Sequence, residues 1–301
     1  MTTSRTPRAV TLALANRVMR AHAPSLDAKT LVKNTRIDRR SSGARRRVAR
    51  VARAAIVRAD ASPKVVVFGG SGFVGSRVVR ALADLGASVT SISKSGRVPE
   101  GAASAMAIDA EDADARTRMT EATRGADVVV SCVGVIGTDD GKMRRGNGDY
   151  NVAIIESAKA AGVKRFVYVS VASIVPDVVG KTPLMKGYFE GKTAAEACLR
   201  ENFDEKDYLI VKPSFIYGGD VFSLTPPRVT KTYGDILAKV LGSGPVKALG
   251  KRAPGPIALT LAEPVSVEDV AGACAAGAMA KNASSVVDGT DDIKALAKTV
   301  R

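Results

Sequence analysis

The feature that most constrains the fold is the stretch KVVVFGGSGFVG at residues 64–75. A short, continuous apolar run predicts a strand that is buried on both faces, and this run ends in glycines. From Gly70 the glycines follow the spacing G-x-G-x-x-G, between the predicted strand and a predicted helix. Glycines permit a tight turn close to a pyrophosphate, and the helix N-terminus offers N–H groups and the positive end of its dipole. We therefore predict a dinucleotide cradle at Gly69, Gly70, Ser71, Gly72, Phe73, Val74 and Gly75; a glycine-rich turn without a ligand is the alternative.

Strand and helix patterns alternate along the chain from this point. Further strands are predicted at residues 87–93, 104–109, 126–134, 164–173 and 207–218, and helices at 73–86, 118–125, 151–162 and 187–202. This alternation predicts an α/β fold, a Rossmann-like doubly wound parallel sheet with helices on both faces. We expect this dinucleotide-binding domain to occupy residues 63–301 and to carry a small C-terminal substrate lobe from about residue 219, where prolines and glycines interrupt the pattern.

The formal charge of +15 lies mainly in the first 62 residues. They contain 15 Lys and Arg against three acids, whereas the remaining 239 residues carry 30 against 27, a net charge of +3. A segment rich in Arg, Ser and Ala and poor in acids predicts an organellar transit peptide without ordered structure. Its end, IVRADAS, resembles cleavage contexts of green-algal plastid precursors, which favours the chloroplast over the mitochondrion. The alternative is a basic arm that stays attached and binds nucleic acid or anionic lipid.

Histidine and cysteine usage excludes several kinds of site. The only histidine, His22, lies in the predicted transit peptide, so the mature chain would lack Ser-His-Asp, Cys-His and H-E-x-x-H machinery. Cys132, Cys198 and Cys274 are far apart in sequence, and we therefore expect neither a disulfide framework nor a metal site. No apolar run approaches the roughly 18 residues that a membrane span needs.

The end of the second predicted strand bears on the choice of cofactor. An NAD site usually has an acid there, about 20 residues after the glycine loop, to bind the ribose 2′-hydroxyl. This chain instead has Ser93, Lys94 and Arg97, which suit a 2′-phosphate, so we expect NADP(H), with NAD(H) possible. The alternative is that both cations are solvated loop charges. Asp109, at the end of the third strand, could accept a hydrogen bond from the adenine amino group or cap the next helix.

The spacing Tyr-x-x-x-Lys occurs twice, at Tyr188/Lys192 and at Tyr208/Lys212. On a strand, residues four apart are separated by about 13 Å. On a helix they lie within about 6 Å of each other, so only Tyr188 and Lys192 can share a proton. A nearby ammonium favours the phenolate, and we expect it to lower the pKa of Tyr188 and make this residue a general acid or base.

These motifs, with Asp127, Asn151 and the stretch KPSFIYGG, resemble the extended and atypical short-chain dehydrogenase/reductases over about residues 64–275. The stretches GYFEGKTAAEACL and PVSVEDVA look most like a plastid and mitochondrial subgroup. That subgroup includes a plastoglobule-associated protein and an accessory protein of the coenzyme Q biosynthesis complex.

The resemblance implies residue roles. Tyr188 would exchange a proton with the substrate oxygen, and Lys192 would also hold the nicotinamide ribose. A serine after the fifth strand would orient the substrate. Ser170 ends that strand, but the position two residues further is Ala172, so Ser173 is the second candidate. The implied cofactor contacts also include Val133, Gly134 and Pro213.

Two functions follow as hypotheses. The first is an NADP(H)-dependent oxidoreductase acting on a lipophilic carbonyl or alcohol, such as a prenylquinone or terpenoid intermediate. The second is a non-catalytic, nucleotide-binding accessory protein that docks onto an enzyme complex or a lipid surface. The Tyr188/Lys192 pair favours the first, whereas Ala172 and the small lobe favour the second.

Partners and location can be narrowed further. The net charge of +3 outside the first 62 residues disfavours a role in RNA binding. We expect a chloroplast location, at the plastoglobule or the thylakoid periphery. Residues 230–242, TKTYGDILAKVLG, predict an amphipathic helix whose apolar face packs on the domain; contact with a membrane or a cover over the active site are the alternatives.

Overall fold

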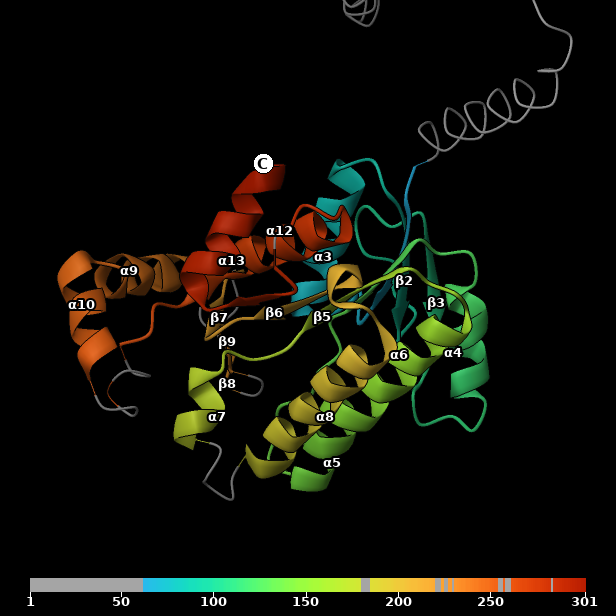
Figure 1. Cartoon of the computed structure of the whole chain (residues 1–301), viewed down its shortest axis with the longest axis horizontal. Helices are drawn as coiled ribbons and strands as arrows, with labels where there is room; N and C mark the ends of the chain where they lie inside the picture. The colour runs from blue at the N-terminus through green and yellow to red at the C-terminus, as the bar shows by residue number, and fades with distance from the viewer. Residues whose placement is uncertain are drawn as a thin grey trace, which may run out of the picture. The chain divides into compact units, whose positions relative to one another are not determined.

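The computed structural model describes residues 62–179, 185–219, 223–224, 227–228, 230–253, 257, 261–282 and 284–301. The predicted transit peptide lies outside these residues. The centre of the fold is a seven-stranded sheet in the order β11-β6-β5-β4-β1-β2-β3 (Figure 1). Its strands are β1 (Lys64–Phe68), β2 (Ser88–Ser93), β3 (Ser104–Ala107), β4 (Val128–Ser131), β5 (Arg165–Val169), β6 (Tyr208–Lys212) and β11 (Val286–Asp288).

All pairings within this sheet are parallel, and the strand order reverses between β1 and β4. The predicted doubly wound parallel sheet is therefore confirmed. A crevice opens at the carboxyl ends of the strands where such an order reverses, and this is where ligands bind in folds of this type.

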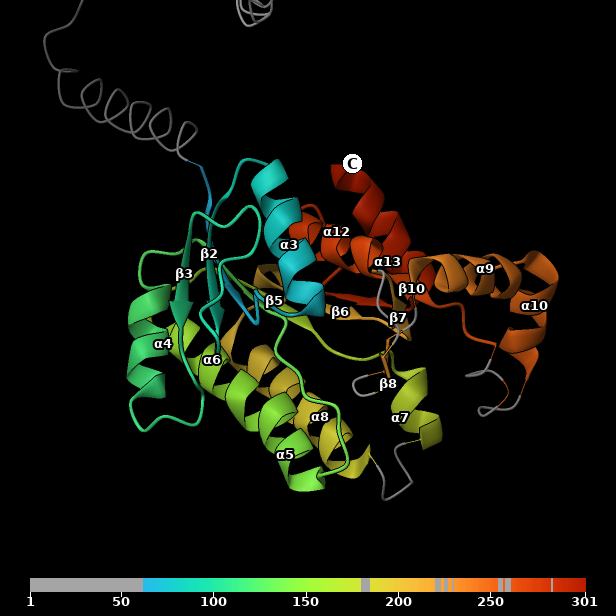
Figure 2. The same ribbon diagram turned by 180° about the vertical axis from the view of Figure 1, so that it is seen from behind.

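Helices cover both faces of the sheet (Figures 1 and 2). One face carries α3 (Phe73–Asp84), α12 (Val267–Ala278) and α13 (Thr290–Ala297), and the other carries α4 (Ala115–Thr123), α6 (Tyr150–Ala160) and α8 (Lys186–Asn202). Successive strand residues point to opposite faces, so Val65 and Val67 pack on the first side while Val66 and Phe68 pack on the second. Because both faces of the sheet are buried, the sequences of the strands are continuous apolar runs.

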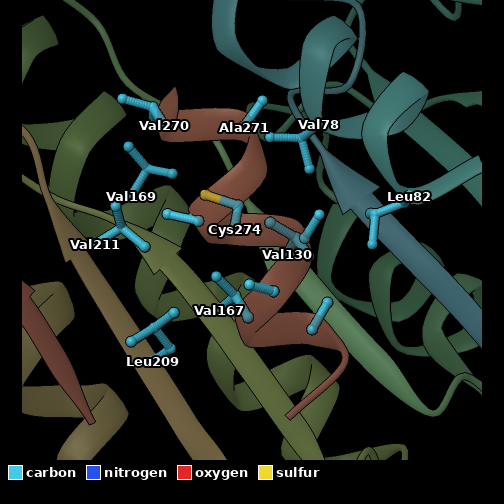
Figure 3. Packing of buried hydrophobic residues seen from close by; sticks show 14 of the residues in the cluster. Val78, Leu82, Val130, Val167, Val169, Leu209, Val211, Val270, Ala271 and Cys274 are labelled. Carbon is cyan, nitrogen blue, oxygen red and sulfur yellow. The ribbon is translucent and has the colours of Figure 1, made fainter. Parts of the chain in front are cut away.

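Small residues let α12 lie close to the sheet. Figure 3 shows Ala271 and Cys274 of this helix among side chains of α3 and of the central strands. A Cβ at Gly277 would lie 2.3 Å from a methyl group of Leu209, so a larger residue there would push the helix away.

Several short elements were not predicted. The strand β11 is the seventh strand of the sheet, and the helix α13 follows it in the chain. The helix α5 (Asp140–Arg144) and the π-helical turn η1 (Arg145–Asp149) precede α6. The remaining short elements are α7 (Ile174–Val179), η3 (Glu205–Asp207) and η4 (Lys298–Val300).

The predicted strand at residues 207–218 is in fact two strands. β6 ends before Pro213, and β7 (Ile216–Tyr217) pairs with β10 (Val265–Ser266) in a separate two-stranded sheet. Proline cannot donate a ladder hydrogen bond, which accounts for the break. Between β7 and β10 the chain forms β8 (Ser223–Leu224), β9 (Pro227–Arg228), α9 (Lys231–Leu241) and α10 (Gly244–Arg252).

The described helices include none that is both long and apolar enough to cross a membrane.

Candidate functional site

The glycine loop turns from β1 into α3 at the point where the strand order reverses. The backbone N–H of Gly72 donates to the carbonyl oxygen of Gly69 at 2.9 Å, which closes the turn. A Cβ at Gly75 would lie 2.1 Å from that same oxygen, so only glycine fits there. An α-helix leaves the N–H groups of its first turn without acceptors, and no side chain in the described part of the chain caps α3. The loop therefore has the form that a pyrophosphate requires.

Two cavities meet at this loop. The first, of about 410 Å³, lies over the ends of β2 and β3, and the second, of about 710 Å³, lies over the ends of β5 and β6. Both are lined by Gly72, Cys132, Val133, Gly134 and Val135. Two cavities that share the loop between them suit the adenosine half and the nicotinamide half of a dinucleotide.

The predicted cofactor residues divide between these cavities. Gly69, Ser71, Ser93, Lys94 and Asp109 line the first, and Phe73, Val74, Lys192 and Pro213 line the second. Gly70, Gly75 and Arg97 line neither cavity. The glycines shape the turn, while Arg97 is exposed, and among the described residues its guanidinium has no ion-pair partner.

Lys94 is engaged by carboxylates. Its Nζ lies 2.7 Å from Asp109 and 3.9 Å from Glu111, and the hydrogen bond to Asp109 raises the pKa of Lys94. The same contact lowers the pKa of Asp109. Asp109 also accepts from the backbone N–H of Glu111, so it caps the turn that precedes α4 rather than α4 itself. A 2′-phosphate would have to compete with Asp109 for the ammonium.

Tyr188 and Lys192 lie one turn apart on α8, as predicted, and both line the second cavity. The buried ammonium of Lys192 donates to the carbonyl oxygen of Val169 at 2.8 Å and lies 4.9 Å from the ring centroid of Tyr168. Its distance from the ring centroid of Tyr188 is 6.0 Å.

The expected lowering of the pKa of Tyr188 is wrong. Burial raises the pKa of Tyr188 to about 12, and it lowers the pKa of Lys192 to about 8. Withdrawal from water penalises the charged form of each group, and the ammonium interacts more directly with Val169 and Tyr168 than with the phenol.

The two candidate serines are held by other groups. The buried hydroxyl of Ser170 donates to Glu196 at 2.6 Å, and Glu196 also pairs with Lys212 at 3.3 Å. Ser170 lines the second cavity but its proton is committed to this carboxylate. Ser173 does not line the cavity, and its backbone N–H donates to Asp288. The hydroxyl proton of Ser170 is therefore committed to Glu196, and Ser173 lies outside the lining of the cavity that contains Tyr188.

Two glycines in α8 allow this helix to lie where it places Tyr188 and Lys192, and the role of these glycines was not predicted. A Cβ at Gly187 would lie 2.2 Å from the carbonyl oxygen of Asp140, and a Cβ at Gly191 would lie 2.7 Å from the backbone nitrogen of Gly148. The helix therefore crosses α5 and η1 at backbone contact. Glycine costs about 1 kcal/mol inside a helix, so two glycines four residues apart were the available signal.

Asn147, in η1, is a further residue that sequence reasoning missed. Its buried amide donates to the carbonyl oxygens of Val135 and Met143 and accepts from the backbone N–H of Val135. These bonds hold the segment that separates the two cavities. The π-helical turn is the structural signal here, because such turns are frequent at functional sites, but it leaves no clear pattern in the sequence.

Residues 69–232, more than half of the chain, match the family described as NAD(P)H-binding. The chain is 34% identical over 223 residues to a chloroplastic protein of Arabidopsis thaliana, which covers 70% of this chain and 69% of that protein. It is 27% identical over 183 residues to 4-hydroxy-2-methyl-3-oxo-4-farnesyl-3,4-dihydroquinoline-1-oxide ketoreductase of Stigmatella aurantiaca, covering 55% of this chain and 54% of that enzyme. The chain thus spans about half the length of the second relative.

A solved structure agrees with the fold. UDP-N-acetylglucosamine 4-epimerase from Methanobrevibacter ruminantium superposes with a TM-score of 0.53 at 19% identity and covers 76% of each chain.

Proposed function

The chain belongs to the NAD(P)H-binding family, and from this premise we propose that it is an NADP(H)-dependent oxidoreductase of the short-chain dehydrogenase type. We assign it a lipophilic carbonyl or alcohol as substrate, such as a prenylquinone or terpenoid intermediate. The observation that carries the proposal is the placement of Tyr188 and buried Lys192 in a cavity that adjoins the glycine loop.

The residues of both cavities fit a nicotinamide dinucleotide. The loop around Gly72 would hold the pyrophosphate, Asp109 and Lys94 the adenosine side, and Lys192 and Pro213 the nicotinamide side. When bound, such a cofactor supplies or accepts a hydride. The protein's task is then to orient the substrate and to move one proton.

Tyr188 suits the reductive direction. With its pKa raised to about 12, the phenol is protonated at neutral pH and can donate its proton to a carbonyl oxygen that gains a hydride. Lys192, with its pKa lowered to about 8, is mostly protonated at neutral pH and stabilises the negative charge that develops on the phenolic oxygen.

The lining of the second cavity supports a lipophilic substrate. Besides Tyr188, the lining of this cavity includes the apolar residues Val135, Ile136, Val175, Met185 and Phe215. Ile136 and Phe215 are each 42% exposed, so the mouth of this cavity is apolar as well. The ketoreductase of Stigmatella aurantiaca, whose name describes a farnesylated substrate, adds support. The chloroplastic relative favours a chloroplast location, for which we propose the plastoglobule or the thylakoid periphery.

A non-catalytic, nucleotide-binding accessory protein is the second candidate. It is favoured by Ala172 at the position where the resemblance places a hydroxyl, and by the commitment of Ser170 to Glu196. Bound nucleotide would then support the fold by several kcal/mol without turnover.

Titration of the full chain with NADPH and with NADH, followed by nicotinamide fluorescence, is the first test. Binding of NADPH and reduction of a quinone or terpenoid carbonyl are expected. Tyr188→Phe should lower turnover by about 10²–10⁴-fold and leave NADPH affinity within about two-fold, because only the proton donor is lost. Tyr208→Phe, in the second Tyr-x-x-x-Lys pair and outside the lining of both cavities, is the matched control.

The outcomes separate the two candidates. Turnover that persists in Tyr188→Phe would remove the catalytic assignment. Binding without turnover of any carbonyl would favour the accessory protein, and binding of neither nucleotide would refute both.

A further inference from the structure

The helix α9 packs on the domain as expected on one side, where Leu237 and Leu241 are half-buried, but a second set of its apolar side chains stays exposed. The buried residues of α9 are its two smallest, Gly234 and Ala238. Tyr233, Ile236 and Val240 are 57%, 58% and 55% exposed. They are three and four residues apart and so lie on one side of the helix. Burying these side chains on the domain would have been favourable, and their exposure therefore indicates another partner.

The orientation of α9 is set by specific contacts. A Cβ at Gly234 would lie 2.0 Å from the ring of Tyr217, so the ring fits only against a glycine. The hydroxyl of Tyr217 donates to Asp235 at 3.0 Å, and this bond opposes a rotation of the helix about its own axis. The neighbouring helix α10 adds Leu249, which is also exposed. We refer to Tyr233, Ile236, Val240 and Leu249 as the α9–α10 surface. The two helices that carry it lie side by side (Figures 1 and 2).

The charge around this surface is positive. Residues 230–257 contain five Lys and Arg against one acid, Asp235, whereas the other residues from 63 onward carry 25 against 26. Lys231 pairs with Asp235, and Lys247 pairs with Glu263. Lys239 and Arg252 are exposed, and within the described ranges neither has an ion-pair partner. These two cations border the apolar face without being neutralised.

We propose that the α9–α10 surface docks onto an anionic lipid surface. A helix with bulky apolar residues on one side and cations beside them lies in the plane of a lipid interface, with its apolar face about 5–10 Å into the headgroup–acyl boundary. Tyr233 suits the polar part of that boundary, where aromatic rings with a polar end are enriched. Lys239 and Arg252 attract anionic headgroups.

Sedimentation of the full chain with vesicles of equal parts phosphatidylcholine and phosphatidylglycerol tests the proposal without nucleotide or substrate. The variant Tyr233→Ser/Ile236→Ser/Val240→Ser should partition at least ten-fold more weakly than the wild type. The comparison is made at 0.15 M and 0.5 M salt. The charged N-terminal 62 residues are common to all variants, and their contribution falls with salt, whereas the apolar contribution persists.

The matched control is Leu85→Ser/Val98→Ser/Met106→Ser, which removes three exposed apolar side chains elsewhere and should partition within two-fold of the wild type. Equal partitioning of wild type and test variant, or an equal loss in the control, would overturn the proposal. A wild-type dimer that the test variant converts to a monomer would also overturn it, because the surface would then bind a second copy.

Unchanged urea unfolding of each variant, followed by circular dichroism, shows that the fold is intact. The vesicle result can be read even if no turnover is ever found, so a failure of this proposal and a failure of the proposed function are distinguishable.

Discussion

We expect the substitution Glu196→Leu to lower the free energy of unfolding by about 3 kcal/mol, because it removes one partner of a buried ion pair. Glu196 is buried on α8, and its carboxylate accepts from Ser170 at 2.6 Å and pairs with Lys212 at 3.3 Å and Arg200 at 3.0 Å. The side chain of Lys212 is only 13% exposed, so its ammonium would be left without a counter-ion in a poorly solvated position.

The contacts of Glu196 contribute unequally to this magnitude. Breaking a buried pair by removing one partner costs about 3–5 kcal/mol. The orphaned hydroxyl of Ser170 accounts for part of that cost, since an unsatisfied buried donor costs about 1–3 kcal/mol. Arg200 is 44% exposed, and its pair adds little because water screens it. Partial hydration of Lys212 places the total at the lower end of the range.

Urea unfolding of the full chain, followed by circular dichroism, measures this loss. Glu190→Leu is the matched control on the same helix, since Glu190 makes an exposed pair with Lys186 at 3.7 Å and its loss should cost under about 1 kcal/mol. The double variant Glu196→Leu/Lys212→Met should recover most of the stability, because both charges are then absent. A loss below about 1 kcal/mol for Glu196→Leu, or no recovery in the double variant, would refute the reasoning.

Three further predictions concern the site. Gly191→Ala should destabilise the protein by about 1–2 kcal/mol, because overpacking against the π-helical turn outweighs the gain in helix propensity. Gly244→Ala, where a Cβ meets no atom within 4 Å, should change stability little, and equal effects in urea unfolding would contradict the close contact. Burial lowers the pKa of Lys192 to about 8, so above that pH the unfolded state binds more protons than the folded state. The stability of the wild type relative to Lys192→Met should therefore rise between about pH 8 and 10, by at most about 1.4 kcal/mol per pH unit, and a flat difference in urea unfolding would be inconsistent with that pKa. Asp109→Asn should free Lys94 and raise the ratio of NADPH to NADH affinity several-fold, whereas Lys94→Ala should lower it; fluorescence titrations that show the same ratio in both variants would exclude a role for this pair in cofactor choice.

Much of the fold could be predicted from the sequence because local patterns of apolar residues and glycines determine it. The run before Gly69 and the alternation of strands and helices identify the doubly wound sheet, and the glycine spacing places the dinucleotide loop at its first turn. The strand β11 was missed because three residues are too few to show a period. The break at Pro213 was missed because the apolar pattern continues on both sides of it.

At the site, the sequence alone placed Tyr188 and Lys192 one helical turn apart, since that spacing depends only on the helix. It could not show that burial dominates both pKa values, or that the hydroxyl of Ser170 is bound to Glu196. Desolvation and side-chain pairing depend on residues that are distant in the chain and brought together only by folding.

The same distinction applies to α9. The sequence determined that residues 230–242 form an amphipathic helix, because periodicity is a local property. Which side of that helix is covered was decided by the ring of Tyr217, which accepts only the glycine face. A hydrophobic period shows where a helix has apolar residues, but only the tertiary structure determines which of them the protein itself covers and which stay exposed.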